Sequence, residues 1–224
     1  MIVTIDGPAA SGKSTVARLL AEKLNASFLD TGAMYRAVTL ASMQAGIDLS
    51  DGAQLLEIAE THDFQFSVKA GKMTVSIDDT NVTEQIRSPR VTANARYIAS
   101  VPKVREKLVR MQRQFAADHQ NIVTEGRDQG TVAFGDADIK FYLTADSAER
   151  ARRRQAELEA KGDDRSLEQT QRDIEERDNS DRSRTVGPLK PAEDAIVVDT
   201  TNLSIEQVVD ELLNLVRDKC SEKN

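Results

Sequence analysis

Short continuous runs of apolar residues alternate along this chain with longer stretches in which apolar residues recur every three or four positions. Continuous runs begin near residues 2, 122, 138 and 195. Such runs are typical of strands that are buried on both faces of a parallel sheet. After the first run, the apolar residues at helical spacing are Val16, Leu19, Leu20 and Leu24. The alternation predicts an α/β protein in which helices cover a mostly parallel sheet.

The middle of the chain departs from this alternation. Residues 64–69 and 72–78 alternate apolar and polar side chains with period two. Gly71 is placed to turn the chain between these runs, and residues 79–81 provide a second turn. The pattern predicts a small antiparallel insertion, which we bound at residues 60–92.

Two further helices follow the insertion. Ser88 precedes a proline, and a serine N-cap with proline at the first helical position is a helix start signal. Pro102 restarts the helical pattern. The apolar stripe that should face inward consists of Val104, Leu108, Met111 and Phe115. Arg105 lies off that stripe, so we expect it to face another surface.

Composition narrows the class of protein. With 224 residues and a hydrophobic content of 39%, the chain is long enough for one α/β domain with its own core. The net charge of −7 argues against general binding to nucleic acid or to an anionic membrane. Cys220 is the one cysteine and allows no internal disulfide, and no apolar run reaches membrane-spanning length. We therefore expect a cytoplasmic protein, and the lack of a long apolar heptad pattern favours a monomer.

The first predicted strand runs into the segment GPAASGKS at residues 7–14. Strand, glycine-framed loop and helix is the context in which GxxxxGK[ST] forms a P-loop, whose amides surround nucleotide phosphates. In such a loop Lys13 reaches the β- and γ-phosphates, and the hydroxyl of Ser14 ligates Mg²⁺. The ATP-binding residues expected from the motif are Gly7, Pro8, Ala9, Ala10, Ser11, Gly12, Lys13, Ser14 and Thr15.

Polar residues also follow two other predicted strands. Tyr35 and Arg36 begin a helix after the short run Phe28-Leu29, and Arg127 and Asp128 follow the run that begins near residue 122. Ligands of doubly wound sheets collect at the carboxyl ends of strands, so an arginine there is well placed for an anion. On the local sequence alone, a surface salt bridge for Arg36 and simple packing for Tyr35 are alternatives.

Arginines are dense between residues 146 and 184. On a helix Arg150, Arg153 and Arg154 share a face, where they are placed to stabilise a phosphoryl group in transfer. The segment EERDNSDRSR, residues 175–184, has no apolar residue. One interpretation is a solvated helix end, supported by weak pairs of opposite charge. The interpretation that we favour is a mobile lid, which lies open without substrate and closes over nucleotides.

Five segments together resemble the bacterial cytidylate (CMP) kinases. They are IDGPAASGKSTVA, LDTGAMYRA, the helix with VREKL, EGRDQGT, and ERDNSDRSR followed by PL. The resemblance implies one P-loop kinase domain over residues 1–224, a three-layer fold with a five-stranded parallel sheet. It places the antiparallel insertion in the monophosphate-binding region and a helical lid at residues 146–184. The implied reaction is phosphorylation of CMP or dCMP by ATP, with Mg²⁺ as cofactor.

The resemblance also implies roles by position, with Lys13 as the central catalytic residue. The residues that would bind CMP are Thr31, Tyr35, Arg36, Arg105, Arg127, Asp128, Arg177, Asp181 and Arg184. The first three would face the monophosphate. Arg127 and Arg177 would hold the α-phosphate, and Asp181 would accept hydrogen bonds from the sugar. The residues that would read the base are Arg105, Asp128 and Arg184.

Two positions depart from the family pattern. Arg96 stands where a serine near the base is common, so its role is left open. Gln129 stands where an apolar residue is commoner in GRDxG, which puts the local packing in question.

The residues alone leave other P-loop classes open. A kinase of UMP, shikimate or gluconate would share the P-loop and differ in its acceptor site. A regulatory GTPase would need an NKxD-like guanine reader, which this sequence lacks. A P-loop ATPase would need a paired acidic motif after an apolar strand, to which Glu125 is only a weak counterpart.

Overall fold

The computed structural model describes residues 1–69, 72–160 and 162–221. Contacts divide the chain into two compact units. The first unit comprises Met1–Ala26 and Val123–Asn224, and the second comprises Ser27–Ile122.

The predicted five-stranded parallel sheet is present, with strand order β2-β6-β1-β7-β8. Its strands are β1 (Ile2–Asp6), β2 (Ser27–Asp30), β6 (Ile122–Gly126), β7 (Ile139–Thr144) and β8 (Ile196–Asp199). In the first unit β7 pairs in parallel with β1 and with β8, and Ile5 lies opposite Phe141. Val3 and Ile5 have no exposed surface. Burial on both faces accounts for the uninterrupted β-branched run at the start of the sequence.

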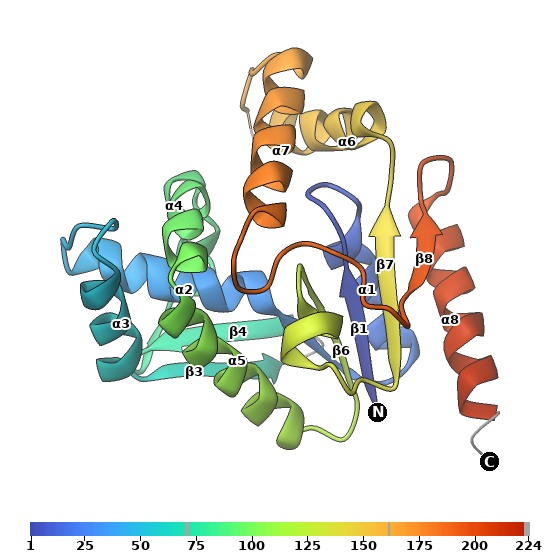
Figure 1. Ribbon diagram of the computed structural model, residues 1–224, viewed down its shortest axis with the longest axis horizontal. Coiled ribbons are helices and arrows are strands. Elements are labelled where there is room, and N and C mark those ends of the chain that lie inside the picture. The colour runs from blue at the N-terminus through green and yellow to red at the C-terminus, as the bar shows by residue number, and fades with distance from the viewer. Residues whose placement is uncertain (70–71, 161, 222–224) are drawn as a thin grey trace. The chain divides into compact units, whose positions relative to one another are not determined.

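The helices of the first unit are α1 (Lys13–Lys23), α6 (Ser147–Glu159), α7 (Leu167–Arg182) and α8 (Ile205–Ser221). α1 packs against α8, and α6 packs against α7. Figure 1 shows α6 and α7 beyond the carboxyl end of β7. This is the edge of the sheet at which ligands of doubly wound folds bind.

The second unit holds α2 (Thr31–Gln44), α3 (Gly52–Thr61), α4 (Pro89–Ser100), α5 (Pro102–Ala117) and the short 3₁₀ helix η1 (Gln85–Arg87). The predicted small antiparallel sheet is present here as β3 (Phe64–Lys69), β4 (Lys72–Ile77) and β5 (Thr80–Asn81). Asp78 and Asp79 turn the chain between β4 and β5 with positive φ angles of 47° and 65°. The turn predicted at Gly71 lies outside the described residues. The predicted N-cap is present, because Ser88 Oγ accepts from Val91 N–H at 3.4 Å.

The inward face of α5 differs from the prediction at Met111, which is only half-buried. Gln112 is buried in its place, and so is Arg105. The reason is that α5 packs against α2, α3 and α4. Three neighbouring helices cover a wider face than the narrow stripe that the apolar residues mark.

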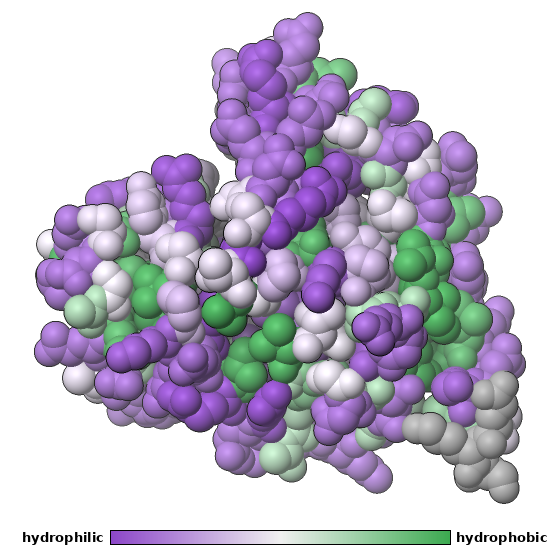
Figure 2. All heavy atoms as spheres, viewed as in Figure 1, coloured by the Kyte–Doolittle hydropathy of each residue, from purple (hydrophilic) through white to green (hydrophobic). Residues whose placement is uncertain are grey.

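The surface over α6 and α7 is predominantly hydrophilic (Figure 2), in keeping with the dense charges of that sequence. Among the described residues, the exposed large apolar side chains are Leu167, Ile196 and Val197. None of the helices that the structure describes is both long enough and apolar enough to span a membrane.

Candidate active site

The loop between β1 and α1 bends through residues with positive φ. A Cβ on Gly7, whose φ is 151°, would lie 2.1 Å from the carbonyl oxygen of Leu143, so only glycine fits there. Ala10 and Gly12 have φ angles of 57° and 86°, and Gly12 is the N-cap of α1. The first amides of α1 have no acceptor within the helix, and they carry the positive end of its dipole. The loop and helix therefore form a site for an anion such as a phosphate.

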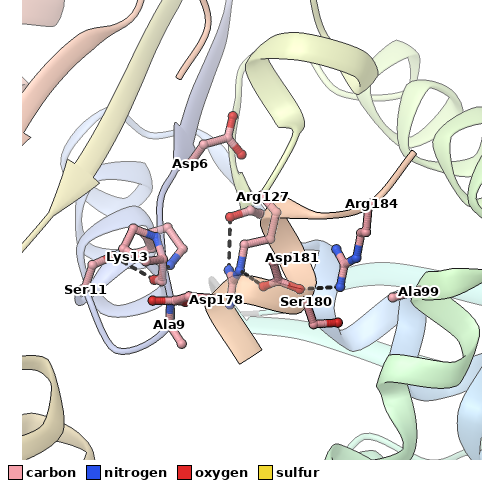
Figure 3. A network of polar contacts seen from close by, with 12 residues as sticks. Asp6, Ala9, Ser11, Lys13, Ala99, Arg127, Asp178, Ser180, Asp181 and Arg184 are labelled. Carbon is pink, nitrogen blue, oxygen red and sulfur yellow. Dashed lines mark hydrogen bonds and ion pairs between the residues drawn. The ribbon is translucent and has the colours of Figure 1, made fainter. Parts of the chain in front are cut away.

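Lys13 is enclosed by the loop to which it belongs (Figure 3). Its Nζ donates to the carbonyl oxygen of Pro8 at 2.5 Å and to Ser11 Oγ at 3.3 Å, and the residue is 4% exposed. Burial, and then the charge of Arg127, hold the pKa of Lys13 well below its usual value. A phosphate beside this ammonium would favour the charged form, because opposite charges stabilise each other strongly in a buried site.

Ser14 connects α1 to the carboxyl end of β6. Its Oγ donates to Glu125 Oε1 at 2.9 Å. Hydroxyl and carboxylate oxygens suit Mg²⁺, which takes its other ligands from water and from nucleotide phosphates. Within the described part of the chain, no group of three or more His, Cys, Asp or Glu side chains is arranged to hold a metal ion. Ser14 and Glu125 fit a magnesium site that a bound nucleotide would complete.

Asp6, at the end of β1, holds the loop that carries Arg127 and Asp128. Its carboxylate accepts from the backbone N–H of Gln129 at 2.9 Å and from that of Gly130 at 2.8 Å. Burial raises the pKa of Asp6 to about 6, against the effect of these two hydrogen bonds. The side chain of Gln129, whose packing was in question, accepts from Thr124 Oγ1 at 2.9 Å inside the core. The loop is therefore fixed by paired polar groups.

Arg127, Asp181 and Arg184 form a network of ion pairs, in which Asp181 lies between the two arginines (Figure 3). Arg127 Nε is 2.8 Å from Asp181 Oδ2, and a guanidinium nitrogen of Arg184 donates to Asp181 Oδ1. Burial alone would raise the pKa of Asp181, but the arginines hold it below its usual value. Burial would likewise lower the pKa of Arg127, but Asp181 and Glu125 raise it.

Arg177, one turn before Asp181 on α7, adds a further cation to this group. Its pKa falls to about 10 because the surrounding protein limits its hydration, and then because Arg127 lies near. Lys13 is affected by the same two arginines, Arg127 and Arg177. Lys13 and Arg177, whose pKa values neighbouring cations lower, would gain stability from a shared anion, so this cluster suits a phosphate.

Arg150 does not have the environment of a residue that reaches for a phosphoryl group. Its Nη1 lies 2.6 Å from Asp178 Oδ2 and 3.0 Å from the carbonyl oxygen of Ala9, and its Nε donates to the carbonyl oxygen of Ala145 at 3.1 Å. The side chain is 7% exposed. These polar atoms of Arg150 are thus bound by groups of the protein itself.

Arg153 and Arg154 lie one turn further along α6 and have other partners. Arg153 donates to Thr200 through Nη1 and Nη2, and its Nε is 3.0 Å from Glu149 Oε1. Arg154 pairs with Glu157 at 2.9 Å, near the surface. A cavity of about 340 Å³ opens beside the P-loop, and its lining includes Gly12, Thr15, Arg153, Leu203 and Ile205. Glu149, Glu157 and Ser204 also line it, so the cavity offers both polar groups and the apolar side chains of Leu203 and Ile205 to a ligand.

In the second unit, Asp30 holds two arginines at the start of α2. Its carboxylate lies 3.1 Å from Arg36 Nη2 and 3.2 Å from Arg87 Nη2, and it also caps α2 by accepting from Ala33 N–H at 2.8 Å. Arg36 Nε is buried and has no hydrogen-bond acceptor among the described residues. A buried donor without an acceptor destabilises the protein, so an anion that supplied an acceptor here would be favoured.

Thr31, Tyr35 and Arg105 belong to the same unit. Thr31 is the buried first residue of α2, and the Arg105 guanidinium lies 5.6 Å from the centre of the Tyr35 ring. Arg105 is 4% exposed and donates to the carbonyl oxygen of Ala99 at 3.4 Å. Arg96 is exposed and lies 5.1 Å from the centre of the Tyr97 ring.

Sequence reasoning missed several polar residues that support these sites. They are Asp6, Asp30, Arg87 and Asp178, and Glu125 as a partner of Ser14. Asp6 and Asp30 had a signal, because each is an acid at the end of a predicted strand. Asp178 had none, because one acid in a charged segment looks like its solvated neighbours.

Comparison with known proteins places this arrangement in a family. Residues 3–218 match the model of the cytidylate kinase family. A cytidylate kinase of Limosilactobacillus reuteri (strain DSM 20016) is 47% identical over 216 residues, which are 96% of this chain and 94% of the relative. A cytidylate kinase of Stutzerimonas stutzeri (strain A1501) is 46% identical over 220 residues, covering 97% and 96% of the two chains.

Among solved structures, an uncharacterized protein from Eubacterium ventriosum shares the fold. It matches with a TM-score of 0.51 at 13% identity, over 97% of this chain and 98% of that one. At that identity the likeness concerns the fold alone. The family model and the relatives in sequence carry more: this chain belongs to the cytidylate kinase family.

Proposed function

We propose that this protein transfers the γ-phosphoryl group of ATP to CMP and dCMP, giving ADP and the nucleoside diphosphate. The observation that carries the proposal is the cluster of Lys13, Arg127 and Arg177 beside the P-loop, in a chain of the cytidylate kinase family. Phosphoryl transfer needs mainly positioned cations, because negative charge spreads over the migrating group.

For ATP, the amides of the P-loop and the start of α1 would hold the β- and γ-phosphates, with Lys13 following the charge in transfer. Ser14 would ligate Mg²⁺, with Glu125 as its hydrogen-bond partner at 2.9 Å. When bound, Mg²⁺ neutralises phosphate charge. The adenine would occupy the cavity lined by Arg153 and Ile205.

For the phosphate of CMP, we assign the residues by position and chemistry. In the second unit, Thr31, Tyr35 and Arg36 would face the monophosphate, and Arg36 Nε would gain its missing acceptor. In the first unit, Arg127 and Arg177 would hold the α-phosphate. Each of these contacts is charge-assisted, and a guanidinium matches phosphate oxygens two at a time.

For the nucleoside, Asp181 would accept hydrogen bonds from the sugar hydroxyls through lone pairs that its two arginines leave open. Asp128 would accept from the cytosine amino group. Arg105 and Arg184 would donate to cytosine N3 and O2. Uracil presents an oxygen in place of the amino group, which a carboxylate repels. The alternative substrate UMP should therefore be used much less well.

The helices α6 and α7, with residues up to 184, would form the lid, and residues 60–92 the insertion of the monophosphate-binding region. Arg153 and Arg154 lie on the lid and would approach the nucleotide as it closes. Of the segment 175–184, Asp178 and Asp181 are buried and paired. The charged segment therefore does not form a wholly solvated helix end. We further propose that the protein acts in the cytoplasm as a monomer, without nucleic-acid or membrane partners.

The test is ADP formation with a panel of nucleoside monophosphates, and with none. We expect rapid ADP formation with CMP and dCMP, much slower formation with UMP, and very little without an acceptor. High turnover without any monophosphate would favour an ATPase instead, and a preference for UMP would move the assignment to another monophosphate kinase.

A further inference from the structure

Both backbone groups of Ala9, in the P-loop, are bound by side chains from the two lid helices. The N–H of Ala9 donates to Asp178 Oδ1 at 2.9 Å, and its carbonyl oxygen accepts from Arg150 Nη1 at 3.0 Å. Arg150 and Asp178 are themselves 2.6 Å apart. Asp178 lies directly beside Ala9 in Figure 3. One residue of α6 and one of α7 thus grip a single residue of the phosphate loop.

This grip is deeply buried and its polar atoms are paired. The side chains of Arg150 and Asp178 are 7% and 1% exposed. Ala9 also packs in a small apolar cluster with Ala151 of α6 and Ile174 of α7. Buried charges persist only where their partners are in place, so the geometry is strongly specified.

The position of Ala9 indicates how its contacts with Arg150 and Asp178 affect the loop. Ala10 comes next, with a φ of 57°, which an alanine adopts only when its surroundings hold it there. Fixing both the N–H and the carbonyl of Ala9 sets the direction in which the chain enters that turn. The N–H and the carbonyl oxygen of Ala9 are bound by protein side chains, so these two contacts act on the shape of the loop.

We propose that Arg150 and Asp178 are positioning residues, which hold the P-loop in its phosphate-binding curve and tie that curve to the bases of α6 and α7. The proposal rests on the proposed binding of ATP by this loop. In this proposal Arg150 acts on ATP binding through Ala9 and not by direct contact with the phosphoryl group. It follows that loss of the grip should weaken ATP selectively, because the residues assigned to CMP keep their own contacts.

The experiment measures the dissociation constant of a non-hydrolysable ATP analogue by calorimetry, and KM for ATP and for CMP. The variants are Arg150→Met, Arg150→Lys, Asp178→Ala and Asp178→Asn. Arg152→Met and Asp173→Asn are matched controls, since these side chains lie on the same two helices near the surface. Thermal unfolding reports whether each variant is folded.

We expect Arg150→Met and Asp178→Ala to weaken binding of the analogue and to raise KM for ATP by about tenfold or more. This is the size of effect expected for the loss of a charge-assisted hydrogen bond. KM for CMP should change by about twofold at most, because only the loop is displaced. Asp178→Asn keeps an oxygen for the Ala9 N–H and Arg150→Lys keeps the charge, so both should lose less. This graded rescue would not arise from a general loss of folded protein, which lowers kcat and leaves both KM values unchanged.

The proposal is overturned if folded Asp178→Ala binds the analogue as tightly as the wild type, or if kcat falls with KM for ATP unchanged. If Arg150→Met and Asp178→Ala do not fold, the conservative variants decide by the same criterion. Calorimetry with the analogue needs no turnover, so its outcome is separate from that of the monophosphate panel.

Discussion

Arg127 and Asp181 form a buried ion pair, in which Arg127 Nε lies 2.8 Å from Asp181 Oδ2. Arg184 binds the other oxygen of the same carboxylate. A single acid thus connects an arginine from the loop after β6 to one beyond the end of α7. This carboxylate holds the two guanidinium groups in place.

Asp181→Asn should destabilise the fold markedly. The change leaves the charges of Arg127 and Arg184 without an ionised partner in a buried site, and breaking such pairs costs about 3 kcal/mol or more. Urea unfolding at neutral pH measures this loss. Asp173→Asn, at a partly exposed position of α7, is the control and should cost about 1 kcal/mol at most. Equal losses in the two variants would mean that the Asp181 network contributes nothing special.

Asp6 should make both stability and activity depend on pH near 6. Its pKa is raised from 3.8 to about 6, so the folded state binds a proton more readily than the unfolded chain. The contribution of Asp6 to the free energy of unfolding therefore falls by about 3 kcal/mol as pH rises from about 4 to about 6, and is constant above. The difference between wild type and Asp6→Asn, measured by urea unfolding across this range, isolates the effect.

The same carboxylate should shape the acid limb of the activity profile. Deprotonated Asp6 accepts from the N–H groups of Gln129 and Gly130, and protonation removes one of these acceptors. We expect kcat/KM for CMP to fall as pH drops through about 6, since this parameter reports groups of the free enzyme. Asp6→Asn should be less active and should lack that limb. An unchanged limb in Asp6→Asn would assign it to another group.

Lys13→Met should leave the fold intact and abolish most of the turnover. Among the described residues, the hydrogen-bond acceptors of Lys13 Nζ belong to its own loop, so the loss of Lys13 disturbs little of the core. Turnover should fall by about a hundredfold or more, because a cation that follows the migrating phosphoryl group is removed. Lys23→Met is the control at the other end of α1, where the lysine side chain is 49% exposed. Near-normal turnover in Lys13→Met would refute phosphoryl transfer at this loop.

Arg36→Met should weaken CMP and UMP in parallel, because phosphate contacts carry no information about the base. We expect kcat/KM to fall by about tenfold or more for both, the loss of a charge-assisted contact. Arg87→Met is the matched control, because Arg87 also pairs with Asp30. Its loss leaves the ion pair between Asp30 and Arg36 in place. A larger effect of Arg87→Met than of Arg36→Met would reverse the assignment of these two arginines.

Local sequence patterns predicted most of the fold. The strand, the glycine-framed loop and the amphipathic helix at the N-terminus follow from steric rules and periodicity, and so do the strands β3 and β4. The inward position of Gln112 could not be predicted, because it depends on which helices cover α5. Single-sequence periodicity does not contain that information.

The site was predicted less completely than the fold. Residues on motifs, such as Lys13 and Arg127, could be named because their position relative to a strand end is local. The partnership of Asp178 with Ala9 joins positions 169 residues apart, and nothing near either residue indicates it. The helical face of Arg150 likewise gives no sign that its guanidinium binds Asp178.

The most direct test of a cytidine-specific kinase is the ratio of kcat/KM for CMP to that for UMP, in the wild type and in Asp128→Ala. Asp128 is 5% exposed and follows Arg127 in the loop that Asp6 fixes. A carboxylate there would attract the cytosine amino group and repel the uracil oxygen, so the wild type should prefer CMP strongly. Asp128→Ala should lower kcat/KM for CMP and change that for UMP little, narrowing the ratio by about 1 to 3 kcal/mol. An unchanged ratio in a folded Asp128→Ala protein would contradict the assignment of this residue to the base and remove the main physical support for cytidine specificity.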